Sequence, residues 1–339
     1  ASGGSEAMTN AYRIFGSELS PYSVKVRSFF RFKGIEHTWI PRSPAVQAEF
    51  QKYAKLPLVP LVVTPKDEGL QDSTPILERI EAAHHEPSVV PDDPALAFVS
   101  ALLEEYGDEW GNKWMFHYRW RYQPDAWSTA ERIAQQMMGA EGTLAVAQAR
   151  AAVAERMLGR RGFVGSNDKT QPLIEASFKK AAALLDAHLA TRPYVLGARP
   201  SMADFGLWGQ LYEAATDPTP GALLRASAPN VMAWVKRMLS PKVEGSFETL
   251  AALSPTLMPL LKEEVADLFL PWSQANAQAI ERGDKSFTMT LGGSEWTQEP
   301  QKYHARSLAE IRRKYAAAKG AAGLEPVLAD SGCLKGLTG

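Results

Sequence analysis

Short apolar stretches and helix-spaced apolar residues alternate along the first quarter of the chain. The pattern predicts strands over residues 12–16, 36–40 and 59–63, and helices over residues 21–33, 44–53 and 75–84. Gly34 is a natural C-terminal cap for the first helix. Thr74 is the expected N-cap of the third, with Pro75 at its first helical position. This order of elements indicates a small α/β domain with one sheet.

Strand-like patterns nearly vanish after a proline-rich break at residues 86–94. Helical periodicity is present over residues 95–123, 129–159, 172–190, 201–215 and 228–239, so this part is expected to be all-helical. From about residue 247 the pattern changes to a helix over residues 255–282, an irregular stretch rich in Gly, Ser and Thr, and a short helix. Ser307 and Glu310 would form a capping box for that short helix, and the tail after Gly320 is expected to be loose.

These patterns divide the chain into four expected parts. They are an α/β domain at residues 8–86, a linker at 87–94, an all-helical domain at 95–245 and a mainly helical extension at 246–339. The extension carries apolar residues on its helical stretch, among them Leu257, Leu261 and Leu268. We therefore expect it to pack onto the helical domain, where it would cover part of a pocket mouth or lengthen a dimer contact.

Composition narrows the class of protein. The 339 residues carry a formal net charge of −1, which gives no field to attract nucleic acid or an anionic membrane surface. The one cysteine, Cys333, excludes a disulfide framework, a cysteine zinc site and a Cys-x-x-Cys redox pair within one chain. No apolar stretch is long enough to span a bilayer. Residues 1–7 are interpreted as an expression remnant before Met8, and a cytoplasmic protein is expected.

Three short motifs carry candidate chemistry. Ser20 lies at the expected start of the first helix, where its hydroxyl caps the helix and can also donate a hydrogen bond to an anion such as a thiolate. If the bond between Val59 and Pro60 is cis, the Val59 backbone is turned outward, free to pair with an extended peptide-like ligand. Asp72 and Ser73 precede a helix, where an acid, a hydroxyl and free amides suit an amino-acid head group. Taken singly, these motifs are more simply a helix cap, a trans proline and a helix start.

Together, in this order and spacing, the motifs resemble those of cytosolic glutathione transferases. The resemblance rests on Tyr12-Arg-Ile-Phe-Gly, Ser20-Pro-Tyr-Ser-Val-Lys-Val-Arg, Leu58-Val-Pro-Leu and Asp72-Ser-Thr-Pro-Ile. Residues 192–207 are similar to the family's buried capping-box segment, in which Ser201 and Asp204 cap one helix reciprocally. The resemblance covers roughly residues 10–240. It implies a thioredoxin-like α/β domain followed by an all-α helical domain, glutathione as co-substrate, no metal, and a homodimer.

The resemblance also assigns roles to individual residues. Ser20 takes the place of the serine that activates the glutathione thiol in the serine-type classes. Val59 and Pro60 would hold the cysteinyl backbone of glutathione. Asp72 with Ser73 would hold its γ-glutamyl end.

Two positions depart from patterns found among relatives. Where this chain has Leu58, relatives often carry Lys or Gln, so nearby Lys55 is the candidate for binding the glycine carboxylate of glutathione. Some members of the family have cysteine at the place of Ser20 and form mixed disulfides there. Thiol–disulfide exchange is therefore the weakest of the functional hypotheses for this chain.

An aromatic stripe marks the first helix of the second domain. Its members, spaced by four residues, are Tyr106, Trp110, Trp114 and Tyr118. Packing in the core or at a dimer interface is the simpler interpretation. In glutathione transferases this helix also borders the electrophile pocket, so the resemblance makes the four residues candidates for the wall of an apolar substrate pocket.

Two functional hypotheses follow from the resemblance. In the first, the protein is an enzyme similar to glutathione transferases, which activates the glutathione thiol for attack on a small apolar electrophile. In the second, it is a non-catalytic glutathione-binding or scaffold protein on the same fold. The two hypotheses differ in whether the Ser20 hydroxyl supports turnover.

Overall fold

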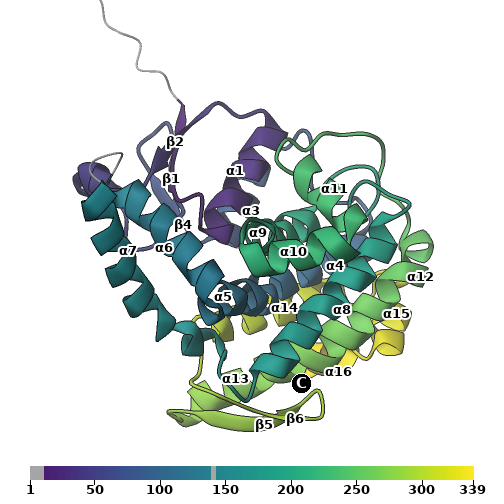
Figure 1. The fold of residues 1–339 in the computed structure, drawn as a ribbon. Coiled ribbons are helices and arrows are strands. Elements are labelled where there is room, and N and C mark those ends of the chain that lie inside the picture. The colour runs from purple at the N-terminus through teal and green to yellow at the C-terminus, as the bar shows by residue number, and fades with distance from the viewer. Residues whose placement is uncertain (1–10, 139–142) are drawn as a thin grey trace, which may run out of the picture. The chain divides into compact units, whose positions relative to one another are not determined.

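The computed structural model describes residues 11–138 and 143–339, so the interpretation of residues 1–7 and the start of the first domain at residue 8 lie outside the described residues. The chain forms two compact units, which divide between Pro87 and Ser88. Figure 1 labels the helices and strands of both.

The first unit is built on a four-stranded sheet in the order β2-β1-β3-β4. Its strands are β1 (Tyr12–Gly16), β2 (His37–Pro41), β3 (Leu61–Val63) and β4 (Gly69–Gln71). Strand β2 is parallel to β1, whereas β3 runs antiparallel to both β1 and β4. The helices are α1 (Pro21–Lys33), α2 (Gln47–Tyr53), which follows a 3-10 turn at Pro44–Val46, and α3 (Ser73–Ala83).

Apolar side chains alternate across this sheet, so each face has its own core. On one face Phe15, Leu61 and Val63 pack with Phe50 of α2. Tyr12 projects to the other face, where its ring meets Phe30 of α1. The predicted α/β thioredoxin-like domain is thereby confirmed.

One detail at the start of α3 differs from the sequence prediction. The N-cap is Asp72, not Thr74, so the helix begins two residues earlier than expected. Thr74 takes helical geometry because the chain turns sharply at Asp72, whose φ is 74°. By contrast, α1 is capped as predicted, with Ser20 at its N-terminus and Gly34 in the left-handed conformation at its C-terminus.

The second unit is mainly helical, as predicted. Its helices through residue 237 are α4 (Pro94–Glu105), α5 (Asn112–Arg121), α6 (Gln123–Met138), α7 (Thr143–Leu158), α8 (Gln171–Leu189), α9 (Met202–Thr216), α10 (Pro218–Ser227) and α11 (Pro229–Arg237). A π-helix, η2 (Tyr106–Gly111), joins α4 to α5, and a 3-10 turn, η3 (Arg161–Val164), precedes α8. The predicted capping box between Ser201 and Asp204 is present at the start of α9.

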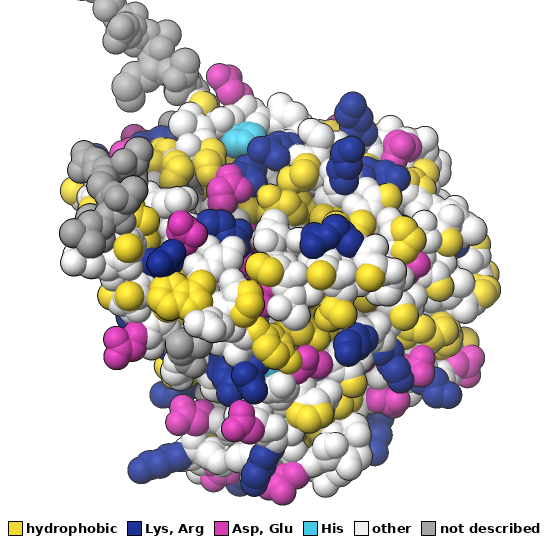
Figure 2. All heavy atoms as spheres, in the orientation of Figure 1, with side chains coloured by type: hydrophobic (Ala, Val, Ile, Leu, Met, Phe, Trp, Pro, Cys, Tyr) yellow, Lys and Arg dark blue, Asp and Glu magenta, His cyan; other side chains and the backbone are white. Residues whose placement is uncertain are grey.

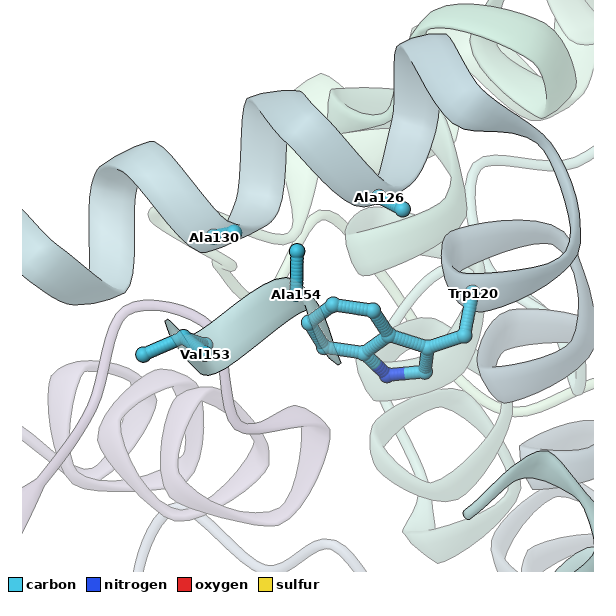
Figure 3. Packing of buried hydrophobic residues seen from close by; sticks show 5 residues of the cluster. All are labelled: Trp120, Ala126, Ala130, Val153 and Ala154. Atoms are coloured by element: carbon cyan, nitrogen blue, oxygen red, sulfur yellow. The ribbon is translucent and has the colours of Figure 1, made fainter. Parts of the chain in front are cut away.

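Two of the long helices expected before residue 245 are divided. The helix expected over residues 95–123 consists of α4, η2 and α5. The one expected over residues 129–159 falls into α6 and α7, and residues 139–142 between them are outside the described part. Figure 3 shows what holds α6 and α7 together: Ala126 and Ala130 face Val153 and Ala154, and the ring of Trp120 fills the space beside them.

The extension belongs to the same compact unit as the preceding helices. It contains α12 (Leu250–Leu260), the π-helix η4 (Leu261–Phe269), α13 (Leu270–Arg282), α14 (His304–Ala318), α15 (Leu324–Ser331) and α16 (Leu334–Thr338). Helix α12 packs against α8, α14 against α4, and η4 against η2. The extension thus shares a hydrophobic core with the helices before it.

Three expectations for the extension are wrong. The irregular stretch is a hairpin of β5 (Phe287–Leu291) and β6 (Ser294–Gln298), because apolar and polar residues alternate there on either side of a turn of two glycines with positive φ. Ser307 is not an N-cap, since α14 already begins at His304, and its hydroxyl donates to Glu109. The tail after Gly320 is not loose but forms α15 and α16, which bury Leu324, Leu328 and Leu337.

Candidate functional site

The strand register of the first unit brings the three predicted motifs to one end of the sheet. Phe15, near the end of β1, pairs with Leu61 at the start of β3, and Leu61 pairs with Gln71 at the end of β4. The segments that leave or enter these positions therefore emerge at the same edge. They are residues 17–20, the Val59–Pro60 pair and Asp72–Ser73.

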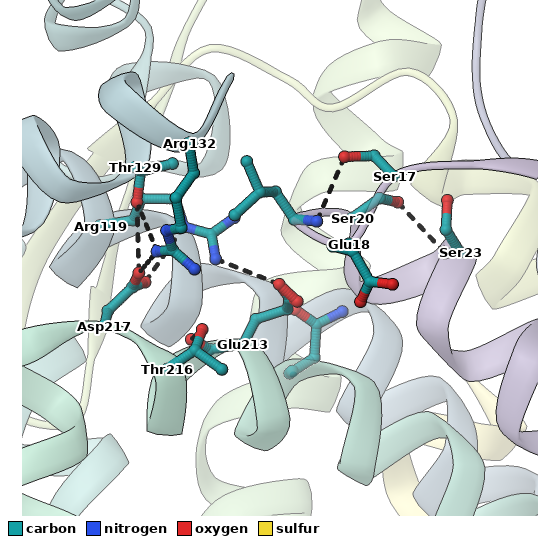
Figure 4. A network of polar contacts seen from close by, with 12 residues as sticks. Ser17, Glu18, Ser20, Ser23, Arg119, Thr129, Arg132, Glu213, Thr216 and Asp217 are labelled. Atoms are coloured by element: carbon teal, nitrogen blue, oxygen red, sulfur yellow. Dashed lines mark hydrogen bonds and ion pairs between the residues drawn. The ribbon is translucent and has the colours of Figure 1, made fainter. Parts of the chain in front are cut away.

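Ser20 is the N-cap of α1. Its Oγ accepts a hydrogen bond of 3.2 Å from the Ser23 backbone N–H, as Figure 4 shows. The hydroxyl hydrogen remains available as a donor, and the side chain is only half-buried. A hydroxyl at the positive end of a thirteen-residue helix is suited to stabilising an anion in front of it.

The bond between Val59 and Pro60 is cis. Neither the N–H nor the C=O of Val59 forms a hydrogen bond with another of the described residues. Pro60 is buried and Val59 half-buried. A backbone amide and carbonyl left free just before a strand can pair with an extended peptide.

Gln71, which the sequence analysis missed, organises the loop before Val59. Its Oε1 accepts hydrogen bonds from the backbone N–H groups of Lys55 and Leu56 at 2.9 and 3.0 Å. Its Nε2 donates to the carbonyls of Leu56 and Leu58, both at 2.8 Å. The side-chain amide of Gln71 thus gives this loop hydrogen bonds of the kind that a neighbouring strand would provide. A lone Gln at a strand end gives no sequence signal for this role.

Asp72 and Ser73 differ in exposure and geometry. Asp72 is exposed and holds a positive φ of 74°, which is uncommon outside glycine and is often retained at functional sites. Ser73 is buried, and its backbone N–H donates to no acceptor within the described residues. Its position at the first residue of α3 directs that N–H toward the space in front of the helix.

Two basic residues flank the loop at this edge. Lys55 has an exposed side chain. Arg42, which the sequence analysis missed, follows β2, and its backbone N–H donates to Gly16 at 2.9 Å. Its guanidinium donates to the Pro57 carbonyl at 2.8 Å and lies over the Phe50 ring. Both cations add positive potential beside the loop.

The aromatic stripe lies in the core of the second unit. Tyr106, Trp110, Trp114 and Tyr118 are each at most 1% exposed. The indole N–H groups of Trp110 and Trp114 both donate to Ser177 at 2.9 Å. The Tyr106 ring packs edge-on against Phe269 of the extension. This placement supports the interpretation as core packing and does not support the assignment to a substrate pocket, because the extension and α8 cover the stripe.

A network of buried charges occupies another part of the second unit (Figure 4). Arg119 Nε donates to Asp217 at 3.1 Å, and Arg132 donates to the same carboxylate at 2.8 Å. Arg119 also lies 3.3 Å from Glu213, whose pKa burial raises to about 7. Opposite charges are paired within this network, which fits a role in joining α5 and α6 to α9.

The described residues hold neither a metal-binding cluster nor a membrane-spanning helix. Across residues 11–138 and 143–339, no group of three or more His, Cys, Asp or Glu side chains is arranged to hold a metal ion. Within the same residues, every helix is too short or too polar to cross a lipid bilayer.

Lysine, arginine and acidic side chains are interspersed on the face shown in Figure 2.

The fold is a thioredoxin-like domain, with the three motifs at one end of its sheet, followed by a helical domain. Comparison with protein-family models matches residues 14–88 to the glutathione S-transferase N-terminal domain and residues 131–237 to the glutathione S-transferase C-terminal domain. The two matches together span more than half of the chain. The chain therefore belongs to the glutathione S-transferase family.

Solved structures with a similar fold include several members of this family. A glutathione S-transferase from Methylobacterium radiotolerans, in complex with glutathione sulfonate, is 18% identical, with 71% of this chain and 99% of that chain covered and a TM-score of 0.41. The β-etherase LigF from Sphingobium sp. strain SYK-6 is 19% identical, with 67% and 94% covered and a TM-score of 0.45. A search of curated proteins found no match.

Proposed function

We propose that this protein is an enzyme of the glutathione transferase type, which binds glutathione at the sheet edge of its first unit and activates the thiol through Ser20. The observation that carries the proposal is the strand register, which brings the Ser20 hydroxyl, the Val59 backbone and the start of α3 to one edge. Membership of the family and the glutathione sulfonate in a similar structure support glutathione as the ligand.

Each part of glutathione has a complementary group at this edge. The cysteinyl backbone would pair with the free N–H and C=O of Val59. The γ-glutamyl ammonium would meet Asp72, and its α-carboxylate the Ser73 N–H at the start of α3. The glycine carboxylate would lie near Lys55 and Arg42, which carry the positive charge beside the loop.

The chemistry follows from lowering the pKa of the bound thiol. A thiol of pKa about 8.5 is mostly protonated at neutral pH, and each unit of lowering requires about 1.4 kcal/mol of preferential binding to the thiolate. A hydrogen bond from Ser20 and the N-terminus of α1 together supply about one to two units. The thiol proton would pass to solvent, and the thiolate would attack an electrophilic carbon of a small apolar molecule held beside it. The new C–S bond would replace either the bond to a leaving group such as halide, which departs as an anion, or a π bond, whose electrons then take up a proton.

We further propose that the protein acts as a homodimer in the cytoplasm. Family membership supports the dimer, and the single, buried Cys333 fits a reducing compartment. Light scattering checks the first point: a mass of twice 37.2 kDa is expected, and a particle of 37.2 kDa would contradict it.

The decisive experiment compares Ser20→Ala with Ser23→Ala. Ser23 lies one turn further along α1, and its buried hydroxyl has no hydrogen-bond partner among the described residues, so loss of this hydroxyl is a matched control. Ser20→Ala is expected to lower turnover of a model aryl halide about tenfold at saturating glutathione, with affinity for glutathione largely kept. Ser20→Thr retains a hydroxyl and the helix cap, and should restore most of the activity.

The outcomes separate the hypotheses. Equal turnover in wild type and Ser20→Ala would remove Ser20 from the mechanism. Glutathione binding with no turnover of any electrophile tested would favour the non-catalytic glutathione-binding protein. No binding of glutathione at millimolar concentration would overturn both.

A further inference from the structure

Lys25 is a buried cation directly behind the predicted γ-glutamyl site. It lies on the second turn of α1 and is 0% exposed. Its Nζ donates to the Ser73 hydroxyl at 3.0 Å and to the Thr74 hydroxyl at 3.4 Å. Lysine is rarely buried this completely, and here its ammonium group gives the first turn of α3 a charged donor.

The contact fixes the direction of the Ser73 hydroxyl hydrogen. An ammonium group has donors only, so the Ser73 oxygen must accept from Lys25. The hydrogen of Ser73 then points away from Lys25 and can be donated to another acceptor. The backbone N–H of Ser73 lacks an acceptor within the described residues. Two donors of one residue, at the positive end of a helix and backed by a cation, are a suitable arrangement for a carboxylate.

We propose that Lys25 is a positioning residue for glutathione recognition. It orients the Ser73 hydroxyl as a donor and adds positive charge behind it, so that the site selects ligands with the free α-carboxylate of a γ-glutamyl group. This inference rests on the proposed glutathione site. It assigns Lys25 no contact with the ligand and no part in activating the thiol.

Lys33 provides a matched control on the same pair of helices. It is also buried on α1, forms an ion pair with Glu81 and donates to the His84 carbonyl at 2.7 Å, beyond the C-terminal end of α3. Lys33 and Lys25 therefore both join α1 to α3, at opposite ends of α3. A purely structural role for Lys25 predicts the same behaviour for Lys25→Met and Lys33→Met.

The test measures calorimetric binding of two probes that cannot react. One is S-methylglutathione, and the other is the same molecule with its γ-glutamyl α-carboxylate converted to an amide. Lys25→Met is expected to weaken binding of the carboxylate probe about tenfold and binding of the amide probe less than about twofold. Lys33→Met should change the two affinities by the same factor. Lys25→Arg, which keeps the charge and the donors, should restore preference for the carboxylate.

Turnover gives an independent readout. In Lys25→Met, KM for glutathione should rise by about the same factor as Kd, while kcat at saturating glutathione stays within about twofold of wild type. Equal weakening of both probes, or no change in either, would overturn the role of Lys25 while leaving the glutathione site intact. Failure of the wild type to bind S-methylglutathione would instead overturn the proposed function. If Lys25→Met does not fold, Lys25→Gln keeps a donor without the charge and is measured in its place.

Discussion

The Ser177 hydroxyl lies 2.5 Å from Oε1 of Glu264 and donates its hydrogen to that oxygen. The bond joins α8 to the π-helix of the extension. The same serine oxygen accepts the indole N–H groups of Trp110 and Trp114, so one hydroxyl satisfies four buried polar atoms, its own included. The extension is therefore held to the aromatic stripe by polar contacts as well as by apolar packing.

Ser177→Ala is expected to destabilise the second unit by about 3 kcal/mol, because two indole N–H groups and a carboxyl oxygen lose a buried partner at once. Urea unfolding followed by tryptophan fluorescence measures the change. Ser227→Ala is the control, since Ser227 is exposed and, within the part of the chain that the structure describes, its hydroxyl donates only to the Leu223 carbonyl. If Ser177→Ala lowered the unfolding free energy by less than about 1 kcal/mol, Ser177 would not be the centre of the network.

Glu264 makes the stability of the second unit depend on pH. Burial raises its pKa from 4.5 to about 8, although Ser177 and Tyr106 oppose the shift. The folded state therefore binds more protons than the unfolded state between these values, and stability falls as pH rises from 4.5 to 8. Glu264→Gln removes this loss. Relative to wild type, the variant should gain stability steadily between pH 5 and pH 8, about 1 kcal/mol or more in all, as measured by urea unfolding. If the difference in unfolding free energy between Glu264→Gln and wild type stayed constant from pH 5 to pH 8, the raised pKa of Glu264 would be contradicted.

Gln71→Glu tests whether the loop before Val59 must be held for glutathione to bind. The carboxylate loses both donors to the Leu56 and Leu58 carbonyls and repels these oxygens. We expect Kd for S-methylglutathione to rise about five- to tenfold, with the stability of the unit lowered by about 1 kcal/mol. Gln51→Glu introduces the same charge on the exposed face of α2 and should leave Kd unchanged. Equal effects of the two variants would mean that charge, not the loop, is responsible.

Asp72→Gly separates backbone strain from ligand binding. Glycine tolerates positive φ, so the variant is expected to be more stable than wild type by up to about 1 kcal/mol. Loss of the carboxylate should nevertheless weaken binding of S-methylglutathione about tenfold. Asp67→Gly is the comparison, because Asp67 also has a positive φ but lies in the turn at the opposite end of β3 and β4. If Asp67→Gly weakened binding as much as Asp72→Gly, the role of Asp72 would be lost.

Much of the first unit could be predicted from the chain alone. Residues 12–16 and 21–33 show the period of a strand and a helix, and both elements form where local spacing and the Ser20 and Gly34 caps indicate. The candidate site was predictable in outline, since its motifs lie at ends of these elements. Gln71, Arg42 and Lys25 were not, because each acts on residues distant in the sequence.

The sequence by itself determined that a thioredoxin-like part precedes a helical part, and that Ser20 caps a helix. Only the tertiary structure decided what covers each apolar face. Periodicity shows that Trp110 and Trp114 share one side of a helix, but the same pattern suits a pocket wall and a core. The stripe lies in the core because Ser177 and Glu264, far along the chain, bond to each other and to its side chains. Side chains pack against the residues that the folded backbone brings near, and the local spacing of apolar residues contains no information about those distant partners.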